Sequence, residues 1–212
     1  MTIWKSFRAD ERGGPAAEFA LVLPLALIFF FGIIDVGRYM WEYNQAEKAT
    51  QMGARFAVAT DIVASGLSGY SFAVSCAVPQ GNAVTAAAFP GINCSGGGTV
   101  AAPSATCSLA ASSSCGTAIP TTSSAAALGL IVNRMRLFKP DILPANVTVN
   151  YGYSGLGYAG DPNGLDVAPL VTVSVTGLTF QPLLTLIFAA PVSMGTFSYT
   201  LTMEDGAGFE SN

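Results

Sequence analysis

Residues 8–38, R-A-D-E-R-G-G-P-A-A-E-F-A-L-V-L-P-L-A-L-I-F-F-F-G-I-I-D-V-G-R, decide the fold, because a basic stub and two glycines lead there into a long apolar run. The run covers residues 19–34 and contains 16 residues without a charge. Glu18 stands at its start, where a carboxylate is costly in lipid and therefore indicates a functional role. We expect a helix that begins near Gly14 and crosses a membrane over residues 14–37.

The charges before the apolar run predict its orientation. Lys5, Arg8 and Arg12 lie within the first 15 residues, and the positive-inside rule places such a stub in the cytoplasm. Residues 1–13 are therefore expected to be a cytoplasmic leader, with the chain after the anchor on the other side. No other segment reaches the ~20 apolar residues that a membrane-spanning helix needs.

The composition excludes several classes of protein. The chain has 212 residues, of which 51% are hydrophobic and only 10% charged, and a net charge of −4. This charge argues against a nucleic-acid partner, which would require a basic patch. The absence of histidine excludes Ser-His-Asp and Cys-His catalysis and histidine-based zinc sites. We expect no enzyme activity, no catalytic residues, no cofactor and no metal. An anchored enzyme that works through Asp or Glu remains an alternative.

Periodicity divides the rest of the chain. Small and apolar residues recur at three- and four-residue steps up to Thr60, which predicts an amphipathic helix over 38–62 that continues the anchor. Residues 62–133 carry no charge, and we interpret 63–120 as a loop-rich insert. A helical pattern returns over 121–138 and ends at Pro140.

The last third alternates with a period of two, which is typical of strands with one buried face. The three segments are 147–153, 171–176 and 197–203. Residues 121–212 are therefore predicted to hold a helix and a three-stranded sheet that packs on the long helix. The predicted fold class is α+β and membrane-anchored: a long N-terminal transmembrane and amphipathic helix followed by a small antiparallel sheet domain with a second helix.

The four cysteines are expected to form two disulfides in an oxidising compartment. They all lie in the insert, at positions Cys76, Cys94, Cys107 and Cys115. Three pairings are possible, and the spacing does not choose among them. A four-thiolate metal site is the alternative, but the chain has no C-x-x-C pair to favour it.

A second polar motif, D-P-N-G-L-D at residues 161–166, offers oxygen atoms that a calcium ion could use. The glycine comes too early for an EF-hand loop, and no closing glutamate follows at the twelfth position. A turn built on Asp-Pro and Asn-Gly explains the motif better.

Three stretches together resemble the TadE-like family, the minor pilins or pseudopilins of the tight-adherence (Flp) pilus system. They are G-G-P-A-A-E-F-A-L-V-L-P-L (13–25), F-G-I-I-D-V-G-R (31–38) and Q-M-G-A-R-F-A-V-A (51–59). The resemblance is strong over residues 12–60 and looser over 120–205. It implies a pilin-like fold and a role in the assembly of a pilus used for surface attachment.

The resemblance also assigns roles to individual residues. Gly13 would end the leader, Gly14 would start the mature chain after cleavage by a prepilin peptidase, and Glu18 would be the fifth mature residue. Glu18 would pair with the new amine in its own or a neighbouring subunit and fix the register of assembly. Pro15 would follow the new N-terminus, where its ring could hinder the peptidase.

The implied partners are the inner membrane, the peptidase, other pilins and the pilus assembly machinery. The implied location is a bacterial inner membrane, crossed once, with the C-terminal domain in the periplasm or in an extracellular pilus. One alternative is an unprocessed, membrane-anchored periplasmic scaffold that binds an envelope partner. Another is an exported protein with a removable signal peptide, although no A-x-A cleavage site follows the apolar run.

Overall fold

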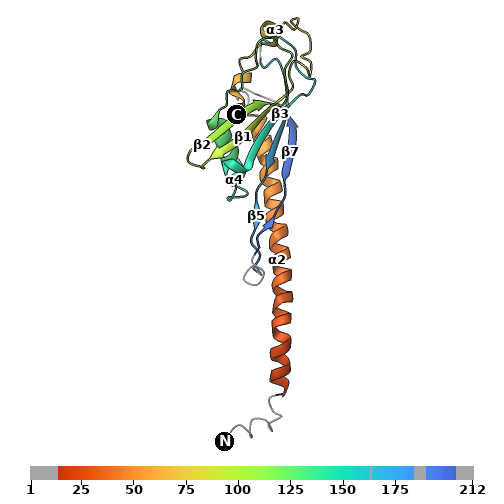
Figure 1. Ribbon diagram of the computed structural model, residues 1–212, viewed down its shortest axis with the longest axis vertical. Helices are drawn as coiled ribbons and strands as arrows, with labels where there is room; N and C mark the ends of the chain where they lie inside the picture. The colour runs from red at the N-terminus through yellow and green to blue at the C-terminus, as the bar shows by residue number, and fades with distance from the viewer. Residues whose placement is uncertain (1–13, 163, 184–189, 204–212) are drawn as a thin grey trace, which may run out of the picture. The chain divides into compact units, whose positions relative to one another are not determined.

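The computed structural model describes residues 14–162, 164–183 and 190–203 (Figure 1). Its elements in chain order are α2 (Gly14–Ala57), η2 (Ser65–Leu67), α3 (Phe72–Ser75), β1 (Ile92–Gly98), β2 (Pro103–Leu109), α4 (Ala125–Arg136), η3 (Pro144–Asn146), β3 (Val147–Gly152), β4 (Leu170–Val175), β5 (Thr179–Phe180), β6 (Val192–Ser193) and β7 (Phe197–Thr202). A long apolar helix thus precedes an antiparallel sheet and a second helix, which confirms the predicted α+β class.

The chain divides into two units. The anchor unit comprises Met1–Trp41 and Thr179–Val192, and the sheet unit comprises Glu42–Leu178 and Ser193–Asn212. Helix α2 runs through both units and stays helical through Pro24. Among the described residues, α2 is the one helix long and apolar enough to cross a membrane.

The main sheet has five antiparallel strands in the order β2-β1-β3-β4-β7. Strands β3, β4 and β7 are the three that the alternating pattern predicts. In β3 and β4 the valines and the tyrosine on one face have no exposed surface, while their neighbours are partly or fully exposed. These fully buried residues are Val147, Val149, Tyr151, Val171, Val173 and Val175.

The predicted number of three strands was wrong. The insert, which was interpreted as loop, supplies two further strands, β1 and β2. Their sequences, I-N-C-S-G-G-G and P-S-A-T-C-S-L, are poor in the β-branched and aromatic residues that mark strands. Pairing stabilises them instead. Strand β1 lies between β2 and β3, and Cys94 is opposite Cys107 on one side and Val149 on the other.

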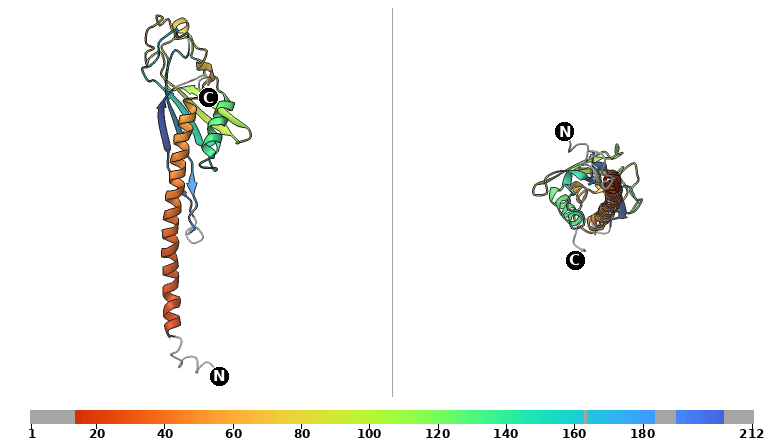
Figure 2. Two further views of the ribbon diagram at one scale, coloured as in Figure 1. Left: turned by 180° about the vertical axis from the view of Figure 1, so that it is seen from behind. Right: turned by 90° about the horizontal axis from the view of Figure 1, so that it is seen from below.

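Two helices cover the same face of this sheet. Figures 1 and 2 show α4 beside the part of α2 that belongs to the sheet unit, both behind the strands in Figure 1 and in front of them in Figure 2. Small residues on α2 allow the close approach: Ala46, Ala49, Ala54 and Ala57 are fully buried. A Cβ added at Gly53 would lie 2.7 Å from the Met135 side chain of α4.

The loop after α2 is fixed to the sheet by a hydrogen bond in the core. The backbone N–H of Val63 donates to the hydroxyl of Tyr151 at 2.9 Å, and both residues are fully buried. Burial raises the pKa of Tyr151, although the hydrogen bond from Val63 acts in the opposite direction. The hydroxyl therefore remains a neutral acceptor for this backbone group at physiological pH.

Helix α4 covers Ala125–Arg136 and is shorter than the helical pattern over 121–138. The Ser124 side chain caps it by accepting a hydrogen bond from the backbone N–H of Ala127 at 3.1 Å, which satisfies one of the free donors of a helix start. Arg134 and Arg136 lie in its last turn, where the helix dipole favours positive charge. The Arg136 guanidinium also donates to the carbonyl of Ile142 at 2.7 Å.

A buried lysine joins α2 to the segment after α4. The Lys139 side chain is only 4% exposed, and its ammonium lies 2.9 Å from the Glu42 carboxylate and 3.0 Å from that of Asp141. Burial acts to lower the pKa of Lys139, but the hydrogen bonds and charges of the two carboxylates outweigh this effect and raise the pKa above its ordinary 10.5. The lysine is therefore charged in the folded protein.

We predict that Gly96→Ala destabilises the sheet unit. The new Cβ would overlap the carbonyl oxygen of Pro144 and lie 2.9 Å from the Leu128 side chain. Overpacking of this kind costs about 1–3 kcal/mol, so the denaturation midpoint should fall. Gly116→Ala is the control, because its Cβ meets nothing within 4 Å. Equal midpoints for the two variants would contradict the packing of β1 against η3.

We predict that Glu42→Gln lowers the unfolding free energy by about 2 kcal/mol, since it removes a charged hydrogen-bond partner of a buried ammonium. Asp141→Asn should cost less than about 1 kcal/mol because Asp141 is 74% exposed. Denaturant titration at neutral pH compares the two variants. A larger loss for Asp141→Asn would show that Glu42 is not the main partner.

The same cluster predicts a loss of stability in alkali. The folded pKa of Lys139 lies above 10.5, so its contribution is complete below that pH and disappears as the pH rises through the folded pKa. Thermal melts above and below this value should therefore show a larger drop in Tm for the wild type than for Lys139→Met. Equal drops would exclude Lys139 as the titrating group.

Candidate assembly site

The start of α2 holds the residues that the sequence assigns to processing and assembly. Gly14 is its first residue, and Glu18 follows four positions later, on the same side of the helix. Both are exposed, and no described residue forms a hydrogen bond or ion pair with the Glu18 carboxylate. Gly13 lies outside the described residues. The Glu18 side chain is thus open to a group that the described part of the chain does not supply.

The helix that carries Glu18 presents its large apolar side chains outward. Seven of those in the apolar run, residues 19–34, are more than half exposed: Phe19, Leu21, Val22, Leu25, Phe29, Phe30 and Ile33. Contiguous apolar surface of this extent is rare on soluble monomers and marks contact with a membrane or another protein. The residues that follow Glu18 therefore offer a surface suited to lipid or to other apolar helices.

The far end of the apolar run is closed by charged residues. The Arg38 guanidinium lies 3.2 Å from the carboxylate of Asp35, three residues earlier on the same helix. The sequence did not indicate a further partner: the backbone N–H of Leu183, just after β5, donates to Asp35 at 2.7 Å. Asp35 is only 6% exposed as a result. A contact between residues 148 positions apart leaves no local sequence signal.

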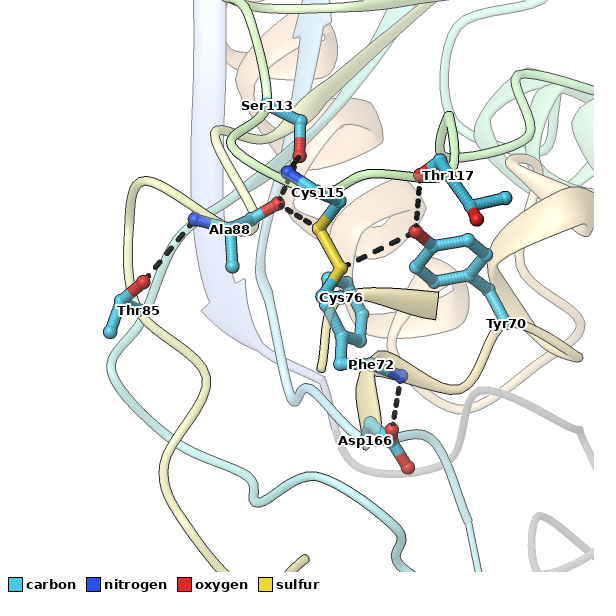
Figure 3. The surroundings of a disulfide bond; sticks show 9 residues. All are labelled: Tyr70, Phe72, Cys76, Thr85, Ala88, Ser113, Cys115, Thr117 and Asp166. Atoms are coloured by element: carbon cyan, nitrogen blue, oxygen red, sulfur yellow. Dashed lines mark hydrogen bonds between the residues drawn. A yellow bond between two sulfur atoms is a disulfide. The ribbon is translucent and has the colours of Figure 1, made fainter. Parts of the chain in front are cut away.

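The four cysteines form two disulfides, Cys76–Cys115 and Cys94–Cys107. The second joins directly opposed residues of β1 and β2. The first joins α3 to the segment before α4 and lies among the hydrogen bonds drawn in Figure 3. The expectation of two disulfides is thus confirmed, and the structure selects one of the three possible pairings.

Hydrogen bonds hold the surroundings of Cys76–Cys115 in place (Figure 3). The Tyr70 hydroxyl donates to the carbonyl of Thr117 at 2.7 Å and lies 3.4 Å from the Cys76 sulfur. Burial raises the pKa of Tyr70 against a smaller opposing effect of Ser75, so the hydroxyl keeps the proton that it donates. The Ser113 hydroxyl donates to the carbonyl of Ala88 at 2.7 Å.

Asp166, the last residue of the motif at 161–166, has a structural role in this region. Asp166 is 6% exposed and accepts hydrogen bonds from the backbone N–H of Phe72 at 2.6 Å and of Asp161 at 3.1 Å. The two carboxylate oxygens therefore hold the start of α3 and the backbone of Asp161. The structure describes no group of three or more His, Cys, Asp or Glu side chains, in the part of the chain that it covers, that could hold a metal ion.

A comparison with known protein families finds a match in the N-terminal part of the chain. Residues 13–55 match the family described as TadE-like protein. The match confirms the resemblance over the segment that holds Gly13, Gly14, Glu18 and almost all of α2, and the sheet unit beyond residue 55 lies outside it. No curated protein and no solved structure matches the chain.

We predict that the two disulfides differ in their resistance to reduction. Cys94 and Cys107 are 1% and 8% exposed, whereas Cys76 and Cys115 are half-buried, and thiol exchange requires access to a sulfur atom. A dithiol reductant at low concentration, followed by alkylation, should therefore label Cys76 and Cys115 first.

Peptide mass spectrometry after chymotrypsin digestion would read the order of labelling. Trypsin is unsuitable because no Lys or Arg lies between Arg55 and Arg134, so all four cysteines share one peptide. Chymotrypsin cleaves after Phe72 and Leu109 but not after Phe89, which precedes Pro90. It separates Cys115 from the other three cysteines, and fragment ions of the peptide 73–109 locate the label on Cys76, Cys94 or Cys107. Earlier labelling of Cys94 and Cys107 would contradict the burial of the β1–β2 disulfide.

Proposed function

We propose that this chain is a membrane-anchored, minor pilin-like protein that acts in the assembly of a tight-adherence (Flp) pilus for surface attachment. The observation that carries the proposal is the overlap of two findings. The segment that matches the TadE-like family is also the helix whose large apolar side chains are exposed, with Glu18 at the start of the run. Its work is assembly rather than catalysis.

In this proposal a prepilin peptidase cuts between Gly13 and Gly14. Glycines on both sides of the bond allow close approach of an enzyme to the backbone. The new amine and Glu18 then carry opposite charges at the start of one helix. Pairing between subunits would reduce the cost of keeping either charge in an apolar bundle, and only one register brings them together.

The proposed location is a bacterial inner membrane, with the N-terminus in the cytoplasm and the sheet unit in the periplasm. The basic residues before α2 support this orientation by the positive-inside rule. The two disulfides support it independently, because such bonds persist in the periplasm and are rare in the cytoplasm.

Intact mass and N-terminal sequencing of the membrane-extracted protein from its own host test the processing step. A chain that starts at Gly14 is the expected result. A chain that starts at Met1 would overturn processing and favour the alternative function, an unprocessed periplasmic scaffold that binds an envelope partner. Pro15 makes this measurement decisive, since its ring restricts the backbone next to the scissile bond.

We predict that Glu18→Ala blocks pilus assembly without unfolding the sheet unit. The change removes the carboxylate that would pair with the amine of Gly14, while the sheet unit keeps its disulfides and its core. Pili counted by electron microscopy and the protection of both disulfides give the two readouts. Glu47→Ala, at an exposed glutamate on the same helix, is the control, and normal pili in Glu18→Ala would contradict the register role.

A further inference from the structure

The outer end of the membrane-spanning segment lies close to Asp35, whether the span is taken to begin at Gly14 or at Phe19. A helix rises 1.5 Å per residue, so the 16 residues of the apolar run cover about 24 Å of a hydrocarbon core that is ~30 Å thick. About twenty residues counted from Gly14 end at Ile33, and twenty counted from Phe19 end at Arg38. Trp41 is 68% exposed and is a residue type that favours the membrane–water interface. Residues 35–41 therefore lie at the outer edge of the bilayer.

The ribbon, which comprises β5, β6 and the adjoining residues 181–183 and 190–191, packs on this part of α2 within the anchor unit. The Tyr39 ring meets the Phe180 ring edge-on, with 5.5 Å between centroids. The Arg38 guanidinium lies 5.3 Å from the centre of the same ring and donates to the carbonyl of Gln181 at 3.4 Å. With the bond from Leu183 to Asp35, these contacts place the ribbon beside the edge of the span.

The ribbon shields the charge that would be costly at this depth. Asp35 is 6% exposed, and its carboxylate is held by Arg38 and by the backbone N–H of Leu183. A lone carboxylate near hydrocarbon is unfavourable, whereas a paired and hydrogen-bonded one is tolerated. The same bond satisfies a backbone donor of the ribbon, which is also necessary near lipid.

The surface between α2 and the ribbon is mainly apolar. A groove lies between α2 and the ribbon. The residues that line it are Asp35, Val36, Tyr39, Met40, Phe180, Pro182 and Val192. Leu183 and Val192 are each 44% exposed, and Val36, which lines the groove together with Val192, is 62% exposed. The surface continues directly into the exposed apolar side of α2, because Val36 also lines a second apolar groove with Phe29 and Ile33. The sequence from residue 167 to residue 203 contains no charged residue.

We propose that this ribbon is a second membrane-contacting element, whose Leu183 and Val192 side chains face the lipid of the outer leaflet. The inference rests on the membrane anchor of the proposed function and extends it. Lipid is the occupant that continuity with the span favours, since the groove and the anchor form one apolar surface. The chain would then be held in the bilayer by α2 and by the ribbon, with Asp35 as the positioning residue between them.

Fluorescence quenching in lipid vesicles tests the proposal on the full chain. The native cysteines are in disulfides, so Leu183→Cys and, separately, Val192→Cys can each take one NBD label. Phosphatidylcholine that carries a doxyl group at carbon 5 quenches from the interfacial layer, and aqueous iodide quenches from the water. Phe29→Cys, within the span, and Val74→Cys, 85% exposed in the sheet unit, are the two controls.

The expected result is quenching of the labels at 183 and 192 by the doxyl lipid, with protection from iodide. Quenching by iodide alone at both positions, while the label at 29 responds to lipid, would overturn the proposal and leave the anchor intact. Iodide quenching at position 29 as well would overturn the anchor itself. Protection of 183 and 192 from both quenchers, with disulfide cross-linking between the unlabelled cysteine variants, would assign the surface to a second copy and overturn the lipid contact.

Variants at Asp35 test how the ribbon is positioned. Asp35→Ala removes the acceptor of the Leu183 N–H and the partner of Arg38, so lipid quenching at 183 should fall while quenching at 29 is unchanged. Asp35→Asn keeps an acceptor oxygen and should retain most of the quenching. Equal quenching in the wild type and in Asp35→Ala would contradict this role of Asp35.

Discussion

The close packing of one side of α2 against the sheet and α4 is the constraint on which the sheet unit depends. Four alanines of this helix are fully buried, and Gly53 leaves room for Met135 where a Cβ would collide with it. Larger side chains at these positions would separate the helix from the strands and open the core. The same helix must expose large apolar residues in its first half. Its sequence therefore changes from bulky and outward-facing to small and inward-facing without a break in the helix.

The fold could be predicted where the physical signal is local. The alternating residues of β3, β4 and β7 mark their buried face directly, and the apolar stripe and capping serine mark α4. Strands β1 and β2 gave no such signal, because glycine, serine and alanine form strands only when partners and a covalent bond hold them. Their strand structure comes from β3 and from the Cys94–Cys107 bond, which periodicity cannot reveal.

The candidate site likewise has features that the sequence predicts and contacts that only the folded structure reveals. Gly14 and Glu18 are separated by one helical turn, so their relation follows from the sequence and is supported by the family match. Asp35 and Lys139 each have one near partner, Arg38 and Asp141, and one distant partner. Glu42 and Lys139 are 97 positions apart, and Asp35 and Leu183 are 148 apart. The sequence can indicate the near partner of a charged residue from its spacing, but the distant partner is known only when the chain is folded.

The disulfide between β1 and β2 makes the completion of the sheet depend on the compartment. In a reducing environment the two strands would lack their covalent link and would have weak intrinsic preference for the extended state. The edge of the sheet at β2 would then be the last part to become ordered, after the chain reaches an oxidising environment. The Cys94–Cys107 bond thus links the order of this sheet edge to the redox state of the surroundings of the protein.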